Sequence, residues 1–227
     1  MGLDIGTTGC RSAVFDPEGN LASMSYQEYR NVFRRPKPSY SEMDPDAMWT
    51  DVTACIKQCI EGGDIDPADI GGVAVSSLGE TVVPVSQDGR HIHPAIDWSD
   101  TRSEGYKTEI DFLDREIGKS TLFTITGYPL SHLPSIIKIL WLREHMPEVY
   151  KKTWKFLCVE DFVNWKLTGE AATDRSVASY TMLFDIRKKK WSSEILAATE
   201  IEESLLPEVH LSGTIIGEVH REASKGT

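Results

Sequence analysis

Alternating apolar and polar residues fill the start of the chain and predict strands at 2–6, 11–16 and 21–29. A Pro/Gly/Asn turn at 17–20 joins the last two as a hairpin. The continuous apolar run at 70–78 predicts a strand that is buried on both faces. Residues 81–98 predict two more strands joined by a turn at 87–89, with Pro84 at an edge or a bulge.

Helical spacing of apolar residues begins after Asp44, which is a candidate N-cap ahead of Pro45. This first helix is predicted to end at Gly62–Gly63. Further helices are predicted at 100–117, 134–146, 160–167 and 192–198, with strands at 155–159 and 213–219. Strands in a meander followed by alternating helices and strands predict a mixed α/β sheet in a single domain.

Composition narrows the class of protein. The chain has 227 residues, a hydrophobic fraction of 40% and a net charge of −11. The acidic balance argues against broad nucleic-acid or anionic-membrane binding. No apolar run approaches the ~18 residues that span a bilayer, and no signal peptide is visible, so we expect a cytoplasmic protein.

The cysteines lack a CxxC pair or a disulfide framework, and reduced thiols are expected for Cys10, Cys55, Cys59 and Cys158. Cys55 and Cys59 are four residues apart on the first predicted helix. Two small core residues on one helical face explain this spacing better than a metal site does.

The stretch GLDIGTTGCRSAVFD carries candidate phosphate chemistry. Gly6 and Gly9 are expected to adopt positive φ and to let the backbone approach a ligand. Thr7 and Thr8 offer donors to phosphate oxygens, and Arg11 offers a charge-assisted contact. A tight turn without a ligand is the plain alternative.

The same stretch excludes two common nucleotide loops. No Lys stands where a Walker A loop needs it, and a dinucleotide fingerprint opens a helix, whereas this turn enters a second strand. A strand with Asp4, a Gly/Thr turn and two antiparallel strands resembles the phosphate-binding hairpin of the actin, heat-shock-protein and sugar-kinase superfamily.

Within that superfamily the chain is most similar to the FGGY family of carbohydrate kinases. The segments EMDPDAMW, GVAVSSLGETVVPVSQDGRHIHPAIDWSDTRS and 126–196 carry the resemblance. It implies an actin-like ATPase (ribonuclease H-like) domain, with a mixed five-stranded sheet flanked by helices. Residues 1–227 would form the amino-terminal, sugar-binding domain of an ATP-dependent kinase, without its carboxy-terminal domain.

The resemblance also implies roles for single residues. Asp4 would hold Mg²⁺, and Thr8 and Arg11 would meet the phosphates of ATP, with Thr7 beside them. Glu80 would accept hydrogen bonds from substrate hydroxyls, because a carboxylate accepts two such bonds. Trp98 would pack against the carbon face of a sugar.

Three further residues are weaker candidates for the substrate site. Asp100 and Arg102 follow Trp98, but Asp100 also suits a helix cap and Arg102 suits an ion pair with Asp100 or Glu104. His132 stands before a predicted helix, near a family position that faces substrate. Asp174 is expected to cap a helix.

Departures from the family pattern leave the substrate open. Gly79-Glu80-Thr81 replaces the Met-His-Gly of xylulose-kinase-like members, and Glu-Thr is closer to glycerol kinases. Gly79 stands where glycerol kinases carry an arginine, and Leu133 is near their pocket tyrosine. Xylulose-like, glycerol and gluconate types remain, which means a ketose, a polyol or a sugar acid.

The catalytic-base aspartate of the family is expected beyond Thr227. We therefore expect these 227 residues to be part of a longer polypeptide. We therefore expect no turnover from residues 1–227 alone. A homodimer of the full-length enzyme stays open. A regulator that binds nucleotide or sugar is the rival class, and an actin-type scaffold ranks last because LGETVV and AIDWSDTRS have no purpose there.

Overall fold

A computed structural model describes residues 1–226, with the backbone alone for residues 103, 104, 222, 225 and 226. Its main sheet has the strand order β3-β2-β1-β6. The strands are β1 (Gly2–Ile5), β2 (Gly9–Phe15), β3 (Leu21–Glu28) and β6 (Ala74–Ser77). β1 pairs antiparallel with β2 and parallel with β6, so the sheet is mixed as predicted.

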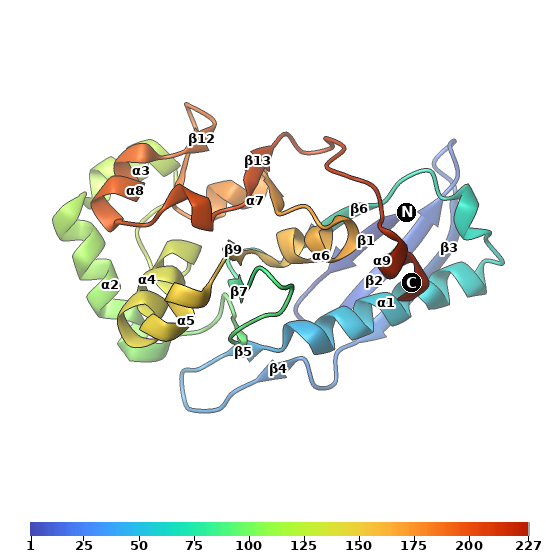
Figure 1. Cartoon of the computed structure of the whole chain (residues 1–227), viewed down its shortest axis with the longest axis horizontal. Coiled ribbons are helices and arrows are strands. Elements are labelled where there is room, and N and C mark those ends of the chain that lie inside the picture. Colours follow the sequence, from blue (N-terminus) through green and yellow to red (C-terminus); the bar gives the residue numbers. More distant parts are fainter. Residues whose placement is uncertain (227) are drawn as a thin grey trace.

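Helix α1 (Pro45–Gly62) covers one face of this sheet (Figure 1). Asp44 caps it as predicted, because its carboxylate accepts from the backbone N–H groups of Asp46 and Ala47. The buried stripe of α1, which includes Val52 and Ile56, packs with Leu3 and Ile5 of β1. The opposite face of β1 therefore carries Gly2 and Asp4.

The rest of the chain is mainly helical and lies at the other end of the molecule (Figure 1). Its helices are α2 (Arg102–Glu116), α3 (Lys119–Thr126), α4 (Ser135–His145), α5 (Pro147–Lys152), α7 (Arg175–Tyr180) and α8 (Ser193–Thr199). Helix α6 (Val159–Thr168) lies toward the sheet, and α9 (Arg221–Gly226) packs beside it. Short 3₁₀ turns occur at Pro67–Asp69 and Glu203–Leu205.

Short ladders connect these parts. β4 (Phe33–Arg34), β5 (Glu42–Met43) and β8 (Ala95–Ile96) form one of them, and β7 (Val83–Val85) pairs with β9 (Lys155–Leu157) in another. β10 (Ala172–Asp174) pairs with β13 (Glu208–His210), and β11 (Phe184–Asp185) pairs with β12 (Lys190–Trp191).

The described residues form two hydrophobic clusters, and β7 and β9 lie between them. Val83 and Leu157 belong to the sheet cluster, whereas their neighbours Val82 and Phe156 belong to the helical cluster. Successive side chains of an extended segment point to opposite sides, so each segment serves both clusters. The segment that follows β6 therefore leads, through β7, into the boundary between the two clusters.

Several sequence predictions were wrong in detail. β6 is half-exposed or exposed along its length and is not buried on both faces, because it forms the edge of the sheet in the described residues. Residues 213–219 form no strand; the strand near this end is β13. The main sheet has four strands in the described part of the chain and not the five that were expected. One strand predicted within 81–98 and the strand predicted at 155–159 are β7 and β9, which pair with each other.

The predicted capping by Asp174 is confirmed, since its carboxylate accepts from Val177 N at 2.7 Å at the start of α7. All four cysteines are free and buried, as expected for core thiols. Within the described residues, no helix is long and apolar enough to cross a membrane.

Candidate active site

Two turns lie next to each other at the end of the main sheet where β1 and β6 terminate. β1 and β6 run parallel with Ile5 opposite Ser77, and Leu78 N donates to Ile5 O at 2.9 Å. Both strands therefore end at the same level. β1 leads into the Gly/Thr turn at 6–9, and β6 leads into Gly79 and Glu80. In α/β sheets ligands bind at the carboxyl ends of the strands, which makes this edge the candidate site.

The Gly/Thr turn is a tight hairpin. Gly6 N donates to Gly9 O at 3.0 Å, and Thr7 and Thr8 lie exposed at the tip. The carbonyl of Thr8 accepts from Tyr29 N at 3.0 Å, which anchors the tip to the end of β3. Exposed hydroxyls at a fixed tip can donate to an anionic ligand.

The positive φ expected for the two glycines of this turn was wrong. Neither Gly6 nor Gly9 has positive φ in the structure. A Cβ on Gly9 would lie 2.4 Å from Gln27 O and 2.7 Å from the Tyr26 hydroxyl, so this position needs glycine because β3 passes very close. A Cβ on Gly6 would be 3.4 Å from Gly9 O, which is an ordinary contact.

Asp4 and Arg11 form a pair across the β1–β2 ladder. They are partners in the register, and Arg11 Nη1 lies 3.0 Å from Asp4 Oδ2. Both side chains are more than half exposed, and the guanidinium also lies over the ring of Tyr26. They line a shallow hollow of about 340 Å³ on the sheet face opposite α1. In this structure Arg11 thus contacts Asp4 and not the Thr7–Thr8 tip.

Asp4 fits Mg²⁺ as a single carboxylate in an open site. Mg²⁺ keeps several waters and is held by one or two carboxylates together with substrate phosphates. Among the described residues, no three His, Cys, Asp or Glu side chains gather in a way that would enclose a metal ion. The donor set therefore suits a metal that arrives with a phosphate ligand.

Glu80 has an unusual backbone conformation. Its φ is +56°, and Thr81 N donates to Gly79 O at 2.8 Å. These features make Glu80 the central residue of a three-residue turn, a strained type for a residue with a side chain. Such strain costs ~1–3 kcal/mol and persists where surrounding contacts impose it, often at functional sites. The strain is a structural signal that the sequence did not reveal.

Tyr128 contacts Glu80 from the segment between α3 and α4. Its hydroxyl donates to Glu80 Oε1 at 2.8 Å. Burial and the Glu80 carboxylate raise the pKa of Tyr128 to about 12, so the phenol keeps its proton. Tyr180, at the end of α7, meets the Tyr128 ring edge-on and lies beside Gly79. Sequence reasoning missed both tyrosines, because neither stands in a motif near Glu80.

Hydrogen bonds connect Trp98 to this turn. Trp98 N donates to the Thr81 hydroxyl at 3.1 Å, and that hydroxyl donates to Asp97 Oδ1 at 3.1 Å. Asp97 is buried, whereas Trp98 is 39% exposed. The structure thus brings Trp98 next to the residue that follows Glu80, with its indole accessible.

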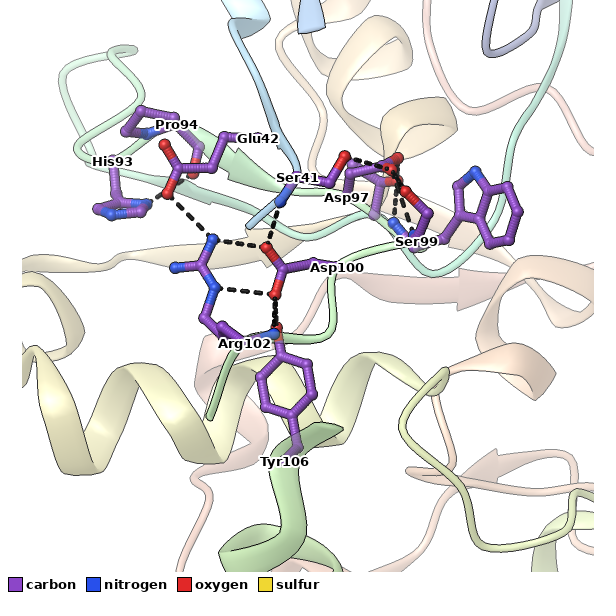
Figure 2. A network of polar contacts seen from close by, with 11 residues as sticks. Ser41, Glu42, His93, Pro94, Asp97, Ser99, Asp100, Arg102 and Tyr106 are labelled. Carbon is purple, nitrogen blue, oxygen red and sulfur yellow. Dashed lines mark hydrogen bonds and ion pairs between the residues drawn. The ribbon is translucent and has the colours of Figure 1, made fainter. Parts of the chain in front are cut away.

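Asp100 and Arg102 form the ion pair that the sequence analysis gave as the alternative to a substrate role, and both residues are buried. Asp100 is fully buried, and its carboxylate accepts from Ser41 N at 2.6 Å, from Tyr106 Oη at 2.6 Å and from Arg102 at 2.8 and 2.9 Å (Figure 2). Burial would raise the pKa of Asp100, but the hydrogen bonds from Arg102 and Tyr106 outweigh it and hold the pKa below its usual range.

Arg102 is 1% exposed and is held on every side. It also pairs with Glu42 at 3.0 Å, and its guanidinium lies 4.1 Å from the ring centroid of Tyr40 and 4.6 Å from that of Trp141. Direct contact of Asp100 or Arg102 with a ligand does not fit this burial. The pair instead fixes the loop that carries Trp98.

His132 lies half-buried before α4, where Lys138 holds the backbone. Lys138 Nζ donates to His132 O at 3.3 Å and also to Leu133 O. Lys138 is fully buried, and burial lowers its pKa to about 8 although the carboxylates of Glu80 and Asp100 oppose this shift. The structure thus shows how the His132 backbone is fixed.

Comparisons with known proteins place this geometry in a family. The model of the "FGGY family of carbohydrate kinases, N-terminal domain" matches residues 1–227. The glycerol kinase of Thermococcus onnurineus is 34% identical over 226 residues, which are 98% of this chain and 45% of that protein. The xylulose kinase of Staphylococcus xylosus is 29% identical over 209 residues, or 92% of this chain and 42% of that protein.

Solved structures agree. The crystal structure of xylulose kinase from Rhodospirillum rubrum superposes with a TM-score of 0.88 at 26% identity, covering 100% of this chain and 45% of that one. The predicted actin-like ATPase fold is confirmed by this similarity. The chain spans less than half the length of these relatives. The chain belongs to the FGGY family of carbohydrate kinases.

Proposed function

We propose that the protein containing this chain transfers the γ-phosphate of ATP to a hydroxyl of a ketose, polyol or sugar acid. The observation that carries the proposal is the meeting of the Gly/Thr turn and the Glu80 turn at one edge of the sheet. One turn suits phosphates and the other suits hydroxyls. Phosphoryl transfer needs mainly the positioning of two such ligands and neutralisation of charge.

On the phosphate side, Thr7 and Thr8 would donate to the phosphates of ATP, and Arg11 would shift from Asp4 to them. The Arg11–Asp4 pair is exposed, so exchanging its partner costs little. Asp4 would then hold Mg²⁺ through water. The metal, when bound, would neutralise charge on the β- and γ-phosphates.

On the acceptor side, Glu80 would accept hydrogen bonds from substrate hydroxyls, and the exposed indole of Trp98 would cover the carbon face. Asp100 and Arg102 would position this loop from below. His132 would border the same site, at the entry to α4. The xylulose type is our first choice, with the glycerol and gluconate types as alternatives.

The general base and the adenosine pocket would come from a carboxy-terminal domain. This proposal rests on the coverage of relatives, since the chain matches less than half of their length. Residues 1–227 would then form one amino-terminal domain. Thr227, after which the base is expected, lies outside the described residues.

The test compares the full-length gene product with residues 1–227 in a coupled ADP-release assay over a panel of ketoses, polyols and sugar acids. We expect turnover from the full-length protein and none above background from residues 1–227. Asp4→Asn should lower kcat at least a hundredfold. ATP and sugar binding by calorimetry without turnover in the full-length protein would instead favour the regulator.

A further inference from the structure

Glu80 presents its two carboxylate oxygens to different partners. Oε1 accepts a hydrogen bond from the Tyr128 hydroxyl at 2.8 Å. The Tyr128 side of the carboxylate is thereby occupied, and Oε2 is the oxygen left to face a ligand. The turn at Gly79–Thr81 fixes the backbone of Glu80, so the phenol and the turn together set the direction of the carboxylate.

The aromatic residues Tyr128, Tyr180 and Trp98 lie next to this turn. Tyr128 and Tyr180 pack edge-on, with ring centroids 6.2 Å apart, and Tyr180 lies along Gly79. Tyr180 is 45% exposed and Trp98 is 39% exposed, so both rings present surface to a ligand. Ring faces suit the C–H faces of a polyhydroxy compound, whose hydroxyls then reach the carboxylate.

Charge around this turn is negative. The Glu80 turn lies next to the buried carboxylates of Asp97 and Asp100. Thr81 donates to Asp97, and Ser41 donates to Asp97 through its hydroxyl and to Asp100 through its backbone N–H. Arg102 and Lys138 are cations of this region in the described part of the chain, and they are 1% and 0% exposed. Arg102 is bound to Asp100 and Glu42, and Lys138 is bound to main-chain carbonyls.

These cations are committed to the protein and are closed to a ligand. Glu80 takes its hydrogen bond from a phenol, a neutral donor, so its charge is not cancelled by a direct partner. An anionic ligand that reached the Glu80 carboxylate would meet like charge in a partly desolvated site. Contact between like charges weakens binding by several kcal/mol. Since each 1.4 kcal/mol changes affinity about tenfold, an anionic ligand should bind at least tenfold more weakly than a neutral one.

We propose that Glu80 and Tyr128 form a selectivity pair that admits neutral polyhydroxy alcohols and ketoses and rejects sugar acids, with Tyr128 as the residue that positions the carboxylate. This inference rests on the proposed kinase function and narrows its substrate class. Removal of the phenol hydroxyl leaves the ring in place but frees Glu80 to turn, so it should weaken the grip on hydroxyls.

Kinetics of the full-length gene product test the pair. Neutral acceptors (glycerol, xylitol, xylulose) should have kcat/KM at least tenfold above gluconate. Tyr128→Phe should raise the KM for the best neutral acceptor about tenfold, since it removes a hydrogen bond to a charged group, and should leave the KM for ATP unchanged. Glu80→Gln should narrow the gap between neutral and anionic acceptors.

Tyr150→Phe is the matched control. Tyr150 is half-buried and packs against Phe156, and its hydroxyl has no hydrogen-bond partner, so its loss should leave both KM values unchanged. Preference for gluconate, or an unchanged acceptor KM in Tyr128→Phe, would overturn the proposal. A rise in the KM for ATP equal to that for the acceptor would show a merely structural role.

A double-mutant cycle separates this inference from the kinase proposal. Unfolding of the wild-type chain, Glu80→Gln, Tyr128→Phe and the double variant in denaturant measures the Glu80–Tyr128 coupling without any ligand. If the two residues are coupled but the full-length protein turns over no acceptor, the proposed kinase function is refuted, and the proposed substrate selectivity with it. Additive effects of the two changes refute the pair, whatever the full-length protein phosphorylates.

Discussion

Asp161 is a carboxylic acid enclosed by the protein at the start of α6. It is 1% exposed, its Oδ2 accepts from Cys158 N at 2.8 Å, and the hydroxyl of Thr173 lies near the carboxyl group. Burial raises the pKa of Asp161 to about 8. A small cavity lined by Ser135, Cys158 and Thr173 adjoins it, with a volume of about 10 Å³, close to the room that one water needs.

This raised pKa makes stability depend on pH. In the unfolded chain Asp161 ionises near its ordinary pKa, whereas in the folded chain its pKa is about 8. Between these two pH values the folded chain therefore binds one more proton than the unfolded chain does. Stability therefore falls as pH rises through this window, by at most roughly 1.4 kcal/mol per pH unit.

Asp161→Asn keeps an acceptor for Cys158 N and removes this titration. The unfolding free energy of the variant relative to wild type should therefore increase between pH 5 and pH 7.5, as measured by urea denaturation at each pH. Asp88→Asn, at an exposed aspartate whose pKa is lowered by the hydroxyl of Ser86, should show no such change. An equal difference at both pH values for Asp161→Asn would contradict the raised pKa.

At the scale of elements, β2 and β3 are joined by backbone hydrogen bonds and also pack very closely at the end that carries Gly9. Gly9 pairs with Glu28 at the end of the β2–β3 register, beside the turn that carries Thr7 and Thr8. Because the main chain at Gln27 lies so close, the position has no room for a side chain.

Gly9→Ala should separate β2 from β3 at this end and destabilise the chain by roughly 1–3 kcal/mol, as overpacking does. Gly6→Ala is the control in the same turn, because its Cβ would make an ordinary contact and its φ is not positive. Gly6→Ala should be neutral or slightly stabilising. Chemical denaturation measures both, and equal effects of the two changes would contradict the steric explanation.

At the scale of the whole molecule, Arg102 joins the two cores. Glu42 belongs to β5, whose neighbour Met43 lies in the sheet cluster, while Trp141 of α4 lies in the helical cluster. Arg102 pairs with Glu42 and stacks on Trp141 (Figure 2 shows the polar part). A planar guanidinium can form paired hydrogen bonds and stack at once, which an ammonium cannot.

Arg102→Lys should therefore lower the free energy of unfolding by roughly 2–4 kcal/mol, because a buried ion-pair network loses part of its geometry. Arg115→Lys is the control, at an exposed arginine that pairs with Glu116. It should change stability by less than about 0.5 kcal/mol. Thermal and urea unfolding measure both, and a loss in Arg102→Lys no larger than in Arg115→Lys would contradict the joining role.

The sequence by itself determined the features that depend on a few neighbouring residues. The opening hairpins, the Asp44 cap of α1 and the Asp174 cap of α7 follow from short patterns, because their hydrogen bonds span two or three residues. The family resemblance came from motifs of the same local kind. Asp4, Glu80 and Trp98 could therefore be identified from the sequence alone.

Only the tertiary structure decided which of these residues meet a ligand and what holds them. Tyr128 reaches Glu80 across 48 positions of the chain, and Asp100 accepts from Ser41 across 59. Such contacts depend on how elements pack, and periodicity and motif spacing do not encode packing. The same limit explains the errors at 70–78 and 213–219. The first is an apolar run and the second has a strand-like sequence, but in the described residues β6 lies at the side of the sheet and 213–219 pairs with no strand.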